Sequence, residues 1–200
     1  MKVAYQGEPG AFAHEACRVF LPDYEPVPRP RFADVFDSVA AGETELGILP
    51  EENVAAGIVP EVRALLERDQ LTVRARHVLP IRMHLMAVPG ARIETITTIV
   101  SHPIALAQCA ATVRALGLAT EESLNTAGAA KALAASGDTT RAVLASEFAA
   151  ATYGLEILRH DLQDRPDNAT RFVVLARGEE GTPPPSSGLH PFPRNRGEER

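Results

Sequence analysis

The chain has 200 residues, of which 45% are hydrophobic and 23% are charged, and its formal net charge is −6. This composition is typical of a globular protein with one compact domain or two small lobes, and the acidic balance argues against nucleic acid or an anionic membrane as a partner. The first residues lack the apolar run of a signal peptide, and Cys17 and Cys109 are the only cysteines, so we expect a reduced, cytoplasmic protein.

Short apolar runs alternate with alanine-rich stretches of helical period along the chain. The first part predicts, in order, a strand at 3–6, helices at 11–20 and 32–41, a strand at 46–49, a helix at 59–68 and an extended segment at 71–88. The second part predicts a strand at 96–100, helices at 104–116 and 127–135, a strand at 141–145, a helix at 147–153 and strands at 155–158 and 172–175. This alternation predicts βαβ units, and therefore an α/β fold with a mainly parallel sheet.

The extended segment 71–88 is long for one strand and contains Pro80. It could cross between two lobes, and the strand that begins near Thr170 could cross back, which would make a hinged cleft of the kind that binds small ligands. A single sheet with a bent strand is the alternative. From Gly178 onward the sequence has few apolar groups and no period, which predicts a disordered tail at 178–200.

Several junctions between the predicted elements carry residues that can bind a ligand. Gly10 and Ala11 precede a helix, where the backbone can approach a ligand closely and free N–H groups can meet an anion. Glu52 and Asn53 follow a buried strand, at the carboxyl end where α/β sheets bind ligands. Taken alone, each junction is better explained as an ordinary turn or a solvated loop.

Two further junctions combine capping residues with polar side chains. Ser101 and His102 do not form a nucleophile and its base, because adjacent residues of an extended strand point to opposite faces. Ser101 is better interpreted as a helix cap before Pro103. Asn125 or Thr126 caps the next helix, for which ordinary capping is a sufficient explanation.

The last junction runs from Asn168 through Thr170, Arg171 and Phe172 into an apolar strand. An arginine at the edge of such a strand is costly unless it is paired with an acid or bound to an anion. The residues themselves leave both interpretations open: a ligand-binding arginine and a structural ion pair.

Taken in order from Val3 to Arg177, these segments resemble the prephenate dehydratase family. The matching stretches are Tyr5-Gln6-Gly7-Glu8-Pro9-Gly10-Ala11-Phe12, Phe32-Ala33-Asp34-Val35-Phe36, Pro50 with Glu52-Asn53 and Gly57, Ser101-His102-Pro103 with Gln108-Cys109, Thr126-Ala127, and Asn168 with Thr170-Arg171-Phe172. The stretch that begins at Ser101 is the most specific of them. The sequence departs from the family at Val54, where Ser or Thr is usual, at Asn125, where Asp is common, and at Ile104, where Gln is frequent.

The resemblance implies two α/β lobes of periplasmic-binding-protein type with a cleft between them, lobe one comprising residues 1–79 plus 170–177 and lobe two residues 80–169. It implies a carbon-oxygen lyase that converts prephenate to phenylpyruvate in phenylalanine biosynthesis, without a cofactor, in a homodimer. No metal is expected either, because the six histidines lack metal-site spacing. The family's ACT regulatory domain does not follow Arg177, so feedback by phenylalanine through it is not expected.

The resemblance also implies roles for individual residues. Thr170 would be the catalytic residue, donating a hydrogen bond to the departing hydroxyl. Substrate carboxylates and polar groups would be held by Arg171, Asn53, Ser101, Gln108, Thr126, Gly10 and Ala11. Glu52 and Phe172 would support these groups, the second by packing. Arogenate dehydratase and a non-catalytic ligand-binding module on the same scaffold are the alternatives.

Overall fold

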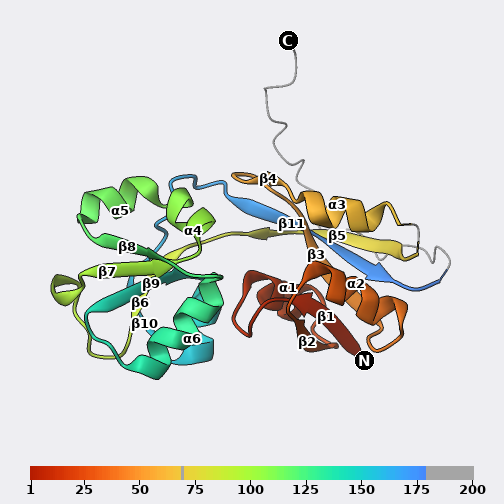
Figure 1. The fold of residues 1–200 in the computed structure, drawn as a ribbon, viewed down its shortest axis with the longest axis horizontal. Helices are drawn as coiled ribbons and strands as arrows, with labels where there is room; N and C mark the ends of the chain where they lie inside the picture. Colours follow the sequence, from red (N-terminus) through yellow and green to blue (C-terminus); the bar gives the residue numbers. More distant parts are fainter. Residues whose placement is uncertain (69, 179–200) are drawn as a thin grey trace, which may run out of the picture.

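The computed structural model describes residues 1–68 and 70–178 (Figure 1). The predicted disordered tail, apart from Gly178, lies outside the described residues. Within the described residues, no helix is both long enough and apolar enough to cross a membrane.

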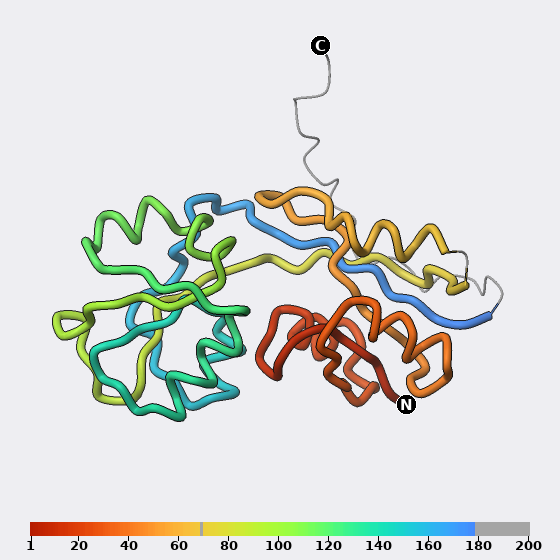
Figure 2. Tube along the Cα trace, in the orientation of Figure 1, coloured from red at the N-terminus to blue at the C-terminus, as the bar shows by residue number. Residues whose placement is uncertain are grey.

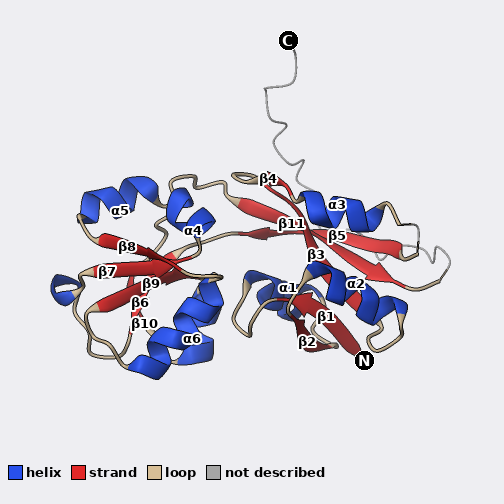
Figure 3. Cartoon of the chain, in the orientation of Figure 1, coloured by secondary structure: helices blue, strands red, loops and turns tan. Residues whose placement is uncertain are grey.

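Two sheets form two α/β lobes, as the resemblance implied (Figure 3). The first sheet has the strand order β2-β1-β3-β11-β5, with β4 paired to β3. Its strands are β1 Lys2–Gln6, β2 Glu25–Arg29, β3 Leu46–Asn53, β4 Gly57–Ile58, β5 Thr72–Pro80 and β11 Ala169–Ala176. The second sheet has the order β10-β6-β9-β7-β8. Its strands are β6 His84–Ala87, β7 Thr98–Ser101, β8 Ala119–Glu122, β9 Arg141–Ala145 and β10 Glu156–Arg159.

Both sheets are mixed, so the expectation of a mainly parallel sheet is wrong. β1 runs parallel to β2 and β3, and β7 runs parallel to β8 and β9. β11 is antiparallel to β3 and β5, and β6 is antiparallel to β9 and β10. The physical reason in the first sheet is that β5 leaves this lobe and β11 returns to it, and a returning strand that lies beside the outgoing one must run the opposite way.

The helices are α1 Phe12–Phe20, α2 Phe32–Ala40, α3 Pro60–Leu66, α4 Pro103–Gln108, α5 Ala110–Leu116, α6 Thr126–Ser136 and α7 Glu147–Tyr153, with a 3-10 turn at Ile93–Thr95. The two faces of the first sheet are covered by different helices. Phe172 and Val174 of β11 pack with α1, whereas Val173 and Leu175 pack with α2 and α3. This alternation fixes the direction of every β11 side chain.

The sequence patterns located most helices and strands, but they missed the strands β2 and β8 and the break between α4 and α5. β2 contains two prolines, which an edge strand tolerates, and β8 is exposed along its whole length, so neither has a buried-strand pattern. The helix predicted at 104–116 is two helices, because Cys109 has φ −117 and ψ 19, outside the helical range. The cause of this break is tertiary and lies in the site described below.

β5 and β11 lie side by side where the chain passes between the lobes (Figures 1 and 2). The backbone N–H of Ile81, just beyond β5, donates to the Asn168 carbonyl, just before β11, at 2.8 Å. The two crossings predicted from the sequence are therefore present. The limits of the two domains as folding units stay a prediction.

The lobes also touch directly where the start of α1 meets α7. Gly10 has φ +85, and a Cβ atom there would lie 3.2 Å from the Ala149 Cα atom. The Ser146 hydroxyl donates to the Gly10 carbonyl at 3.3 Å, and the Tyr153 hydroxyl donates to the Pro9 carbonyl at 2.5 Å. A side chain at Gly10 would push the lobes apart, so glycine is required here for contact between lobes.

Glu15, one turn into α1, faces the same contact. Its Oε2 atom is buried and has no hydrogen-bond partner among the described residues. Burial, and secondarily the negative charge of Glu147 on α7, raises the pKa of Glu15 to about 6. The ionised form is therefore disfavoured in the native state.

We predict that Glu15→Gln stabilises the protein at pH 8 by about 1 kcal/mol, allowing for solvent screening, and has little effect at pH 4. The native pKa of Glu15 is raised, so wild type loses stability as the pH rises from about 4.5 through about 6. Urea unfolding at both pH values measures the difference. Glu147→Gln is the control and should give a smaller gain, because burial is the larger cause. Equal stabilisation by Glu15→Gln at both pH values would contradict this origin.

Candidate active site

A cleft of about 480 Å³ lies between the two lobes. Ala11, Asn53 and Thr170 line it from the first lobe. Gln108 and Thr126 line it from the second lobe. Of the described residues that line the cleft, none is Asp, Glu, Lys or Arg. Apart from the imidazole of His102, the groups that can meet a charge on a ligand are therefore neutral side chains and backbone dipoles.

A β-bulge in β3 decides which side chains face this cleft. Pro50 and Asn53 both line the cleft, although residues three apart on a regular strand point to opposite faces. The register explains this, since Phe172 of β11 lies opposite Pro50 and Arg171 lies opposite Glu52. Glu51 is the extra residue of the bulge. The bulge turns Asn53 to the same face as Thr170.

The Asn53 amide joins the strands at this point. Its Nδ2 lies 2.9 Å from Thr170 Oγ1 and 3.1 Å from both Asn168 Oδ1 and the Ala169 carbonyl, so its two hydrogens are shared among three acceptors. Its Oδ1 accepts from the backbone N–H groups of Ala55 and Ala56 at 2.9 and 2.8 Å. The protein itself engages both ends of the amide, so Asn53 is held in one orientation.

This contact also restricts the directions in which the Thr170 hydroxyl can point its hydrogen, because the hydrogen turns away from the donor Asn53. A hydroxyl carries one hydrogen and accepts through its lone pairs, and here Asn53 donates into the lone pairs. Among the described residues, the structure shows no acceptor for the hydroxyl hydrogen. Thr170 is 8% exposed and lines the cleft. Its hydroxyl is thus available as a hydrogen-bond donor to a bound molecule.

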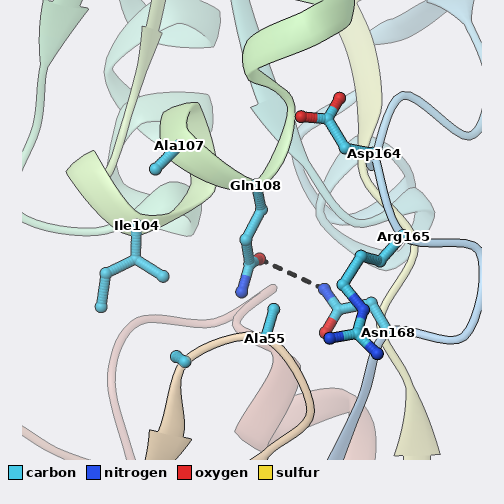
Figure 4. Close-up of a pocket in the computed structure, with 8 residues that line it drawn as sticks. Ala55, Ile104, Ala107, Gln108, Asp164, Arg165 and Asn168 are labelled. Carbon is cyan, nitrogen blue, oxygen red and sulfur yellow. Dashed lines mark hydrogen bonds between the residues drawn. The ribbon is translucent and has the colours of Figure 1, made fainter.

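Gln108, the last residue of α4, brings the second lobe into the same network. Its Nε2 donates to Asn53 Oδ1 at 3.2 Å, and its Oε1 accepts from Asn168 Nδ2 at 3.3 Å (Figure 4). Asn53, Gln108 and Asn168 thus form a closed ring of amides. The ring ties Thr170 to both lobes.

Comparison with known proteins identifies the family of the chain. The sequence model described as prephenate dehydratase matches residues 3–180. The chain belongs to the prephenate dehydratase family. Arogenate dehydratase 1 of Petunia hybrida is 41% identical over 179 residues, which are 88% of this chain and 42% of that protein. A bifunctional N-acyl-homoserine lactone acylase/prephenate dehydratase of Komagataeibacter europaeus is 36% identical over 187 residues, which are 94% of this chain and 66% of that protein.

The fold agrees with a solved structure of the same family. Prephenate dehydratase from Arthrobacter aurescens in complex with L-Phe superposes with a TM-score of 0.82 at 26% identity, over 90% of this chain and 61% of that one. The chain spans about half the length of the curated relatives it matches. Membership of the prephenate dehydratase family therefore describes residues 3–180, and the activity of the whole protein is a separate question.

The family's Thr-Arg-Phe signature divides between the two faces of β11. Thr170 and Phe172 line the cleft, and Phe172 also packs into the core. Arg171 points to the other face, where its Nε donates to Glu51 Oε2 at 3.1 Å and its Nη2 binds Glu52. This corrects the expectation that Arg171 contacts a substrate carboxylate, because the alternation of side chains along the strand turns the Arg171 side chain away from the cleft. Glu52 is its ion-pair partner.

Two other expected ligand contacts are also corrected. Ser101 is fully buried and donates to the Leu144 carbonyl at 2.7 Å, because it is the last residue of β7 and pairs inward with β9. His102 is the actual cap of α4, its Nδ1 accepting from the Ile104 N–H at 3.2 Å. Gly10 lies at the contact between lobes and not among the residues that line the cleft.

The starts of α1 and α6 open on the cleft. Ala11 occupies the N-cap position of α1, a helix of nine residues, and Asn125 caps α6, a helix of eleven residues. Asn125 Oδ1 accepts from the Gly128 N–H at 2.5 Å, which confirms it as a cap. Both ends carry the positive pole of a helix dipole. They are the groups at this cleft best suited to a carboxylate.

Asp164 is a functional candidate that the sequence did not indicate. Its backbone N–H donates to the Gln108 carbonyl at 2.7 Å, and its carboxylate accepts from the Ala111 N–H at 3.1 and 3.2 Å. It therefore caps α5 and stabilises the break at Cys109, which leaves Gln108 at a helix end. Asp164 and Gln108 also line a neighbouring hollow of about 500 Å³ (Figure 4). No local pattern marks it, because its partners are 53 and more residues away.

We predict that Asp164→Ala lowers the free energy of unfolding by about 1 kcal/mol, as loss of a helix cap does. Asp167→Ala is the matched control from the same loop. Asp167 pairs with the exposed Arg165, and its loss should cost less than about 0.5 kcal/mol. Urea denaturation of the three proteins measures both effects. Equal losses for the two variants would contradict the capping role.

Proposed function

We propose that this chain catalyses the decarboxylating dehydration of prephenate to phenylpyruvate. The observation that carries the proposal is the Thr170 hydroxyl, which Asn53 orients so that its hydrogen is free to point into the cleft. Membership of the prephenate dehydratase family over residues 3–180 supports it. A dehydratase needs such a donor where a hydroxyl group leaves.

The reaction needs little more than correct placement of the substrate. The bond from the ring to its carboxylate breaks, carbon dioxide leaves, and the electron pair of that bond completes the aromatic ring as the ring C–O bond breaks. The hydroxide that departs takes up a proton to become water. A threonine hydroxyl is too weak an acid to transfer its proton fully, so Thr170 stabilises the developing negative charge by a hydrogen bond.

The remaining groups of the cleft suit a dicarboxylate with an apolar ring. The N-terminal ends of α1, at Ala11, and α6, at Thr126, meet the carboxylates through backbone N–H groups. Phe12, Phe32 and Ile104, which line the cleft and are not buried, supply apolar surface for the ring. Gln108 holds Asn53 from the second lobe and keeps the donor geometry intact.

The same cleft favours prephenate over arogenate, the amino acid form of the substrate. Arogenate carries an ammonium group where prephenate carries a keto oxygen. None of the described residues that line the cleft is Asp or Glu, so an ammonium group would lose water without gaining an ionic partner. Comparing turnover of the two substrates by the purified chain tests the proposal. We expect kcat/KM to be at least about tenfold higher for prephenate; activity on neither substrate would overturn the proposed function.

We predict that Asn125→Asp shifts the preference toward arogenate, because it adds a carboxylate at the cleft. Aspartate caps a helix as well as asparagine does, so α6 should remain intact. The ratio of kcat/KM for arogenate to that for prephenate should rise by about tenfold. Asp138→Asn changes a half-buried acid outside the cleft and should leave the ratio unchanged. An unaltered ratio in Asn125→Asp would contradict the charge argument.

We predict that Thr170→Ala lowers kcat for prephenate by about 100-fold or more while the protein remains folded. Thr170→Ser keeps the hydroxyl and should retain a larger part of the activity. Circular dichroism of both variants checks the fold. Turnover of Thr170→Ala near that of wild type would rule out the assigned role.

Acyl transfer, the second activity in the name of the Komagataeibacter relative, is less well supported here. It would require a nucleophile next to a base. Among the described residues, the side chain that contacts the Thr170 hydroxyl is the Asn53 amide, whose Nδ2 cannot accept a proton from it. Ser101, the other hydroxyl considered, donates to a backbone carbonyl inside the core. Dehydration is therefore the function proposed.

The family resemblance also supports proposals about partners. We propose a homodimer that binds its small-molecule substrate without a metal or cofactor. Among the described residues, no group of three or more His, Cys, Asp or Glu side chains is placed to hold a metal ion. Light scattering of the purified chain measures the oligomeric state directly.

A further inference from the structure

Arg171 lies directly behind the proposed catalytic residue, on the far face of the sheet. Its neighbours Thr170 and Phe172 line the cleft, while its own guanidinium contacts Glu51 and Glu52. The side chains of Arg171, Glu51 and Glu52 are 26%, 19% and 28% exposed. This is a partly buried ion cluster, so removing one partner would leave the others as uncompensated, poorly hydrated charges.

The cluster sits on the β-bulge that positions Asn53. Glu51 and Glu52 are adjacent in sequence, and on a regular strand they would point to opposite faces. Here both reach the same guanidinium, because the bulge places two residues of β3 opposite Arg171. Two neighbouring carboxylates repel each other unless a cation lies between them.

We propose that Arg171 is a positioning residue: by bridging Glu51 and Glu52 it holds the bulge in register and so keeps Asn53 against Thr170. Asn53 directly follows Glu52, and its Nδ2 lies 2.9 Å from Thr170 Oγ1. If the bulge relaxed by one residue, Asn53 would turn to the opposite face. The kinetic consequences of this inference rest on the proposed function. The effect of Arg171 on the position of Asn53 can be measured without any enzyme assay.

The guanidinium group suits this role better than an ammonium group. Nε contacts one carboxylate and Nη2 contacts the other, so the planar group spans both acids in a fixed geometry. A lysine supplies one compact charge that cannot hold both acids in the same way. Arg171→Lys is therefore expected to restore only part of the function.

Arg76 provides a matched control in the same cluster. From β5 it binds the Glu51 carboxylate through Nε and Nη2, at distances from 2.9 to 3.2 Å. Among the described residues, its carboxylate partner is Glu51 and not Glu52. Its removal takes away one positive charge but leaves the bridge across the bulge intact.

The kinetic test compares wild type, Arg171→Met, Arg171→Lys and Arg76→Met with prephenate as substrate. Arg171→Met should lower kcat by about 10- to 100-fold with KM changed by less than about threefold, because the donor is misplaced while the substrate contacts remain. Arg171→Lys should fall between this variant and wild type, and Arg76→Met should stay within about twofold of wild type. A raised KM with kcat retained would show that Arg171 binds substrate directly, and it would overturn the proposal. The proposal would also be overturned if Arg171→Met left both kcat and KM unchanged, or if Arg76→Met lowered kcat as much as Arg171→Met does.

A second measurement follows the position of Asn53 itself. In a ¹⁵N-labelled chain, the side-chain NH₂ signals of Asn53, assigned from their absence in Asn53→Asp, should shift or broaden in Arg171→Met and stay in place in Arg76→Met. Signals that stay in place in Arg171→Met would overturn the proposal. If Arg171→Met fails to fold, Arg171→Lys carries the same comparison. Should wild type turn over neither substrate, the proposed function fails, and this measurement still decides the role of Arg171.

Discussion

The hydrogen bond from the Asn53 amide to the Thr170 hydroxyl is the contact on which the cleft depends. It spans 117 residues of sequence and joins the strand β3 to the returning strand β11. Because Asn53 acts as the donor, the Thr170 hydroxyl must direct its own hydrogen elsewhere. The amides of Gln108 and Asn168 complete the ring, so the orientation of one hydroxyl is determined by both lobes.

The two faces of β11 differ in the charge of the side chains around them. The described residues that line the cleft face include no Asp, Glu, Lys or Arg, and there helix dipoles can act on a ligand. The charged groups of this strand and its neighbours, Arg171, Glu51 and Arg76, lie on the far face. Charges so close to the site would otherwise compete for the carboxylates of a substrate or for the Thr170 hydroxyl.

Local patterns in the sequence were most reliable where clear local signals bound an element. The strand at Arg141–Ala145 is a short, continuous apolar run, and the helix at Glu147–Tyr153 lies between the cap Ser146 and Gly154, so both have the predicted bounds. The helix predicted across Cys109 was wrong because Asp164, from a distant loop, binds both sides of the break. A pattern read along the chain does not include such a partner.

By itself the sequence determined the α/β class, the family and the segments that meet at the cleft, and its residues offered the crossing at Pro80 as one of two possibilities. Only the tertiary structure decided which of their side chains enter it: Asn53 and Gln108 do, whereas Arg171 and Ser101 do not. The physical reason is that a residue's face depends on strand register. One extra residue in β3, visible only in its pairing with β11, reverses the alternation beyond it.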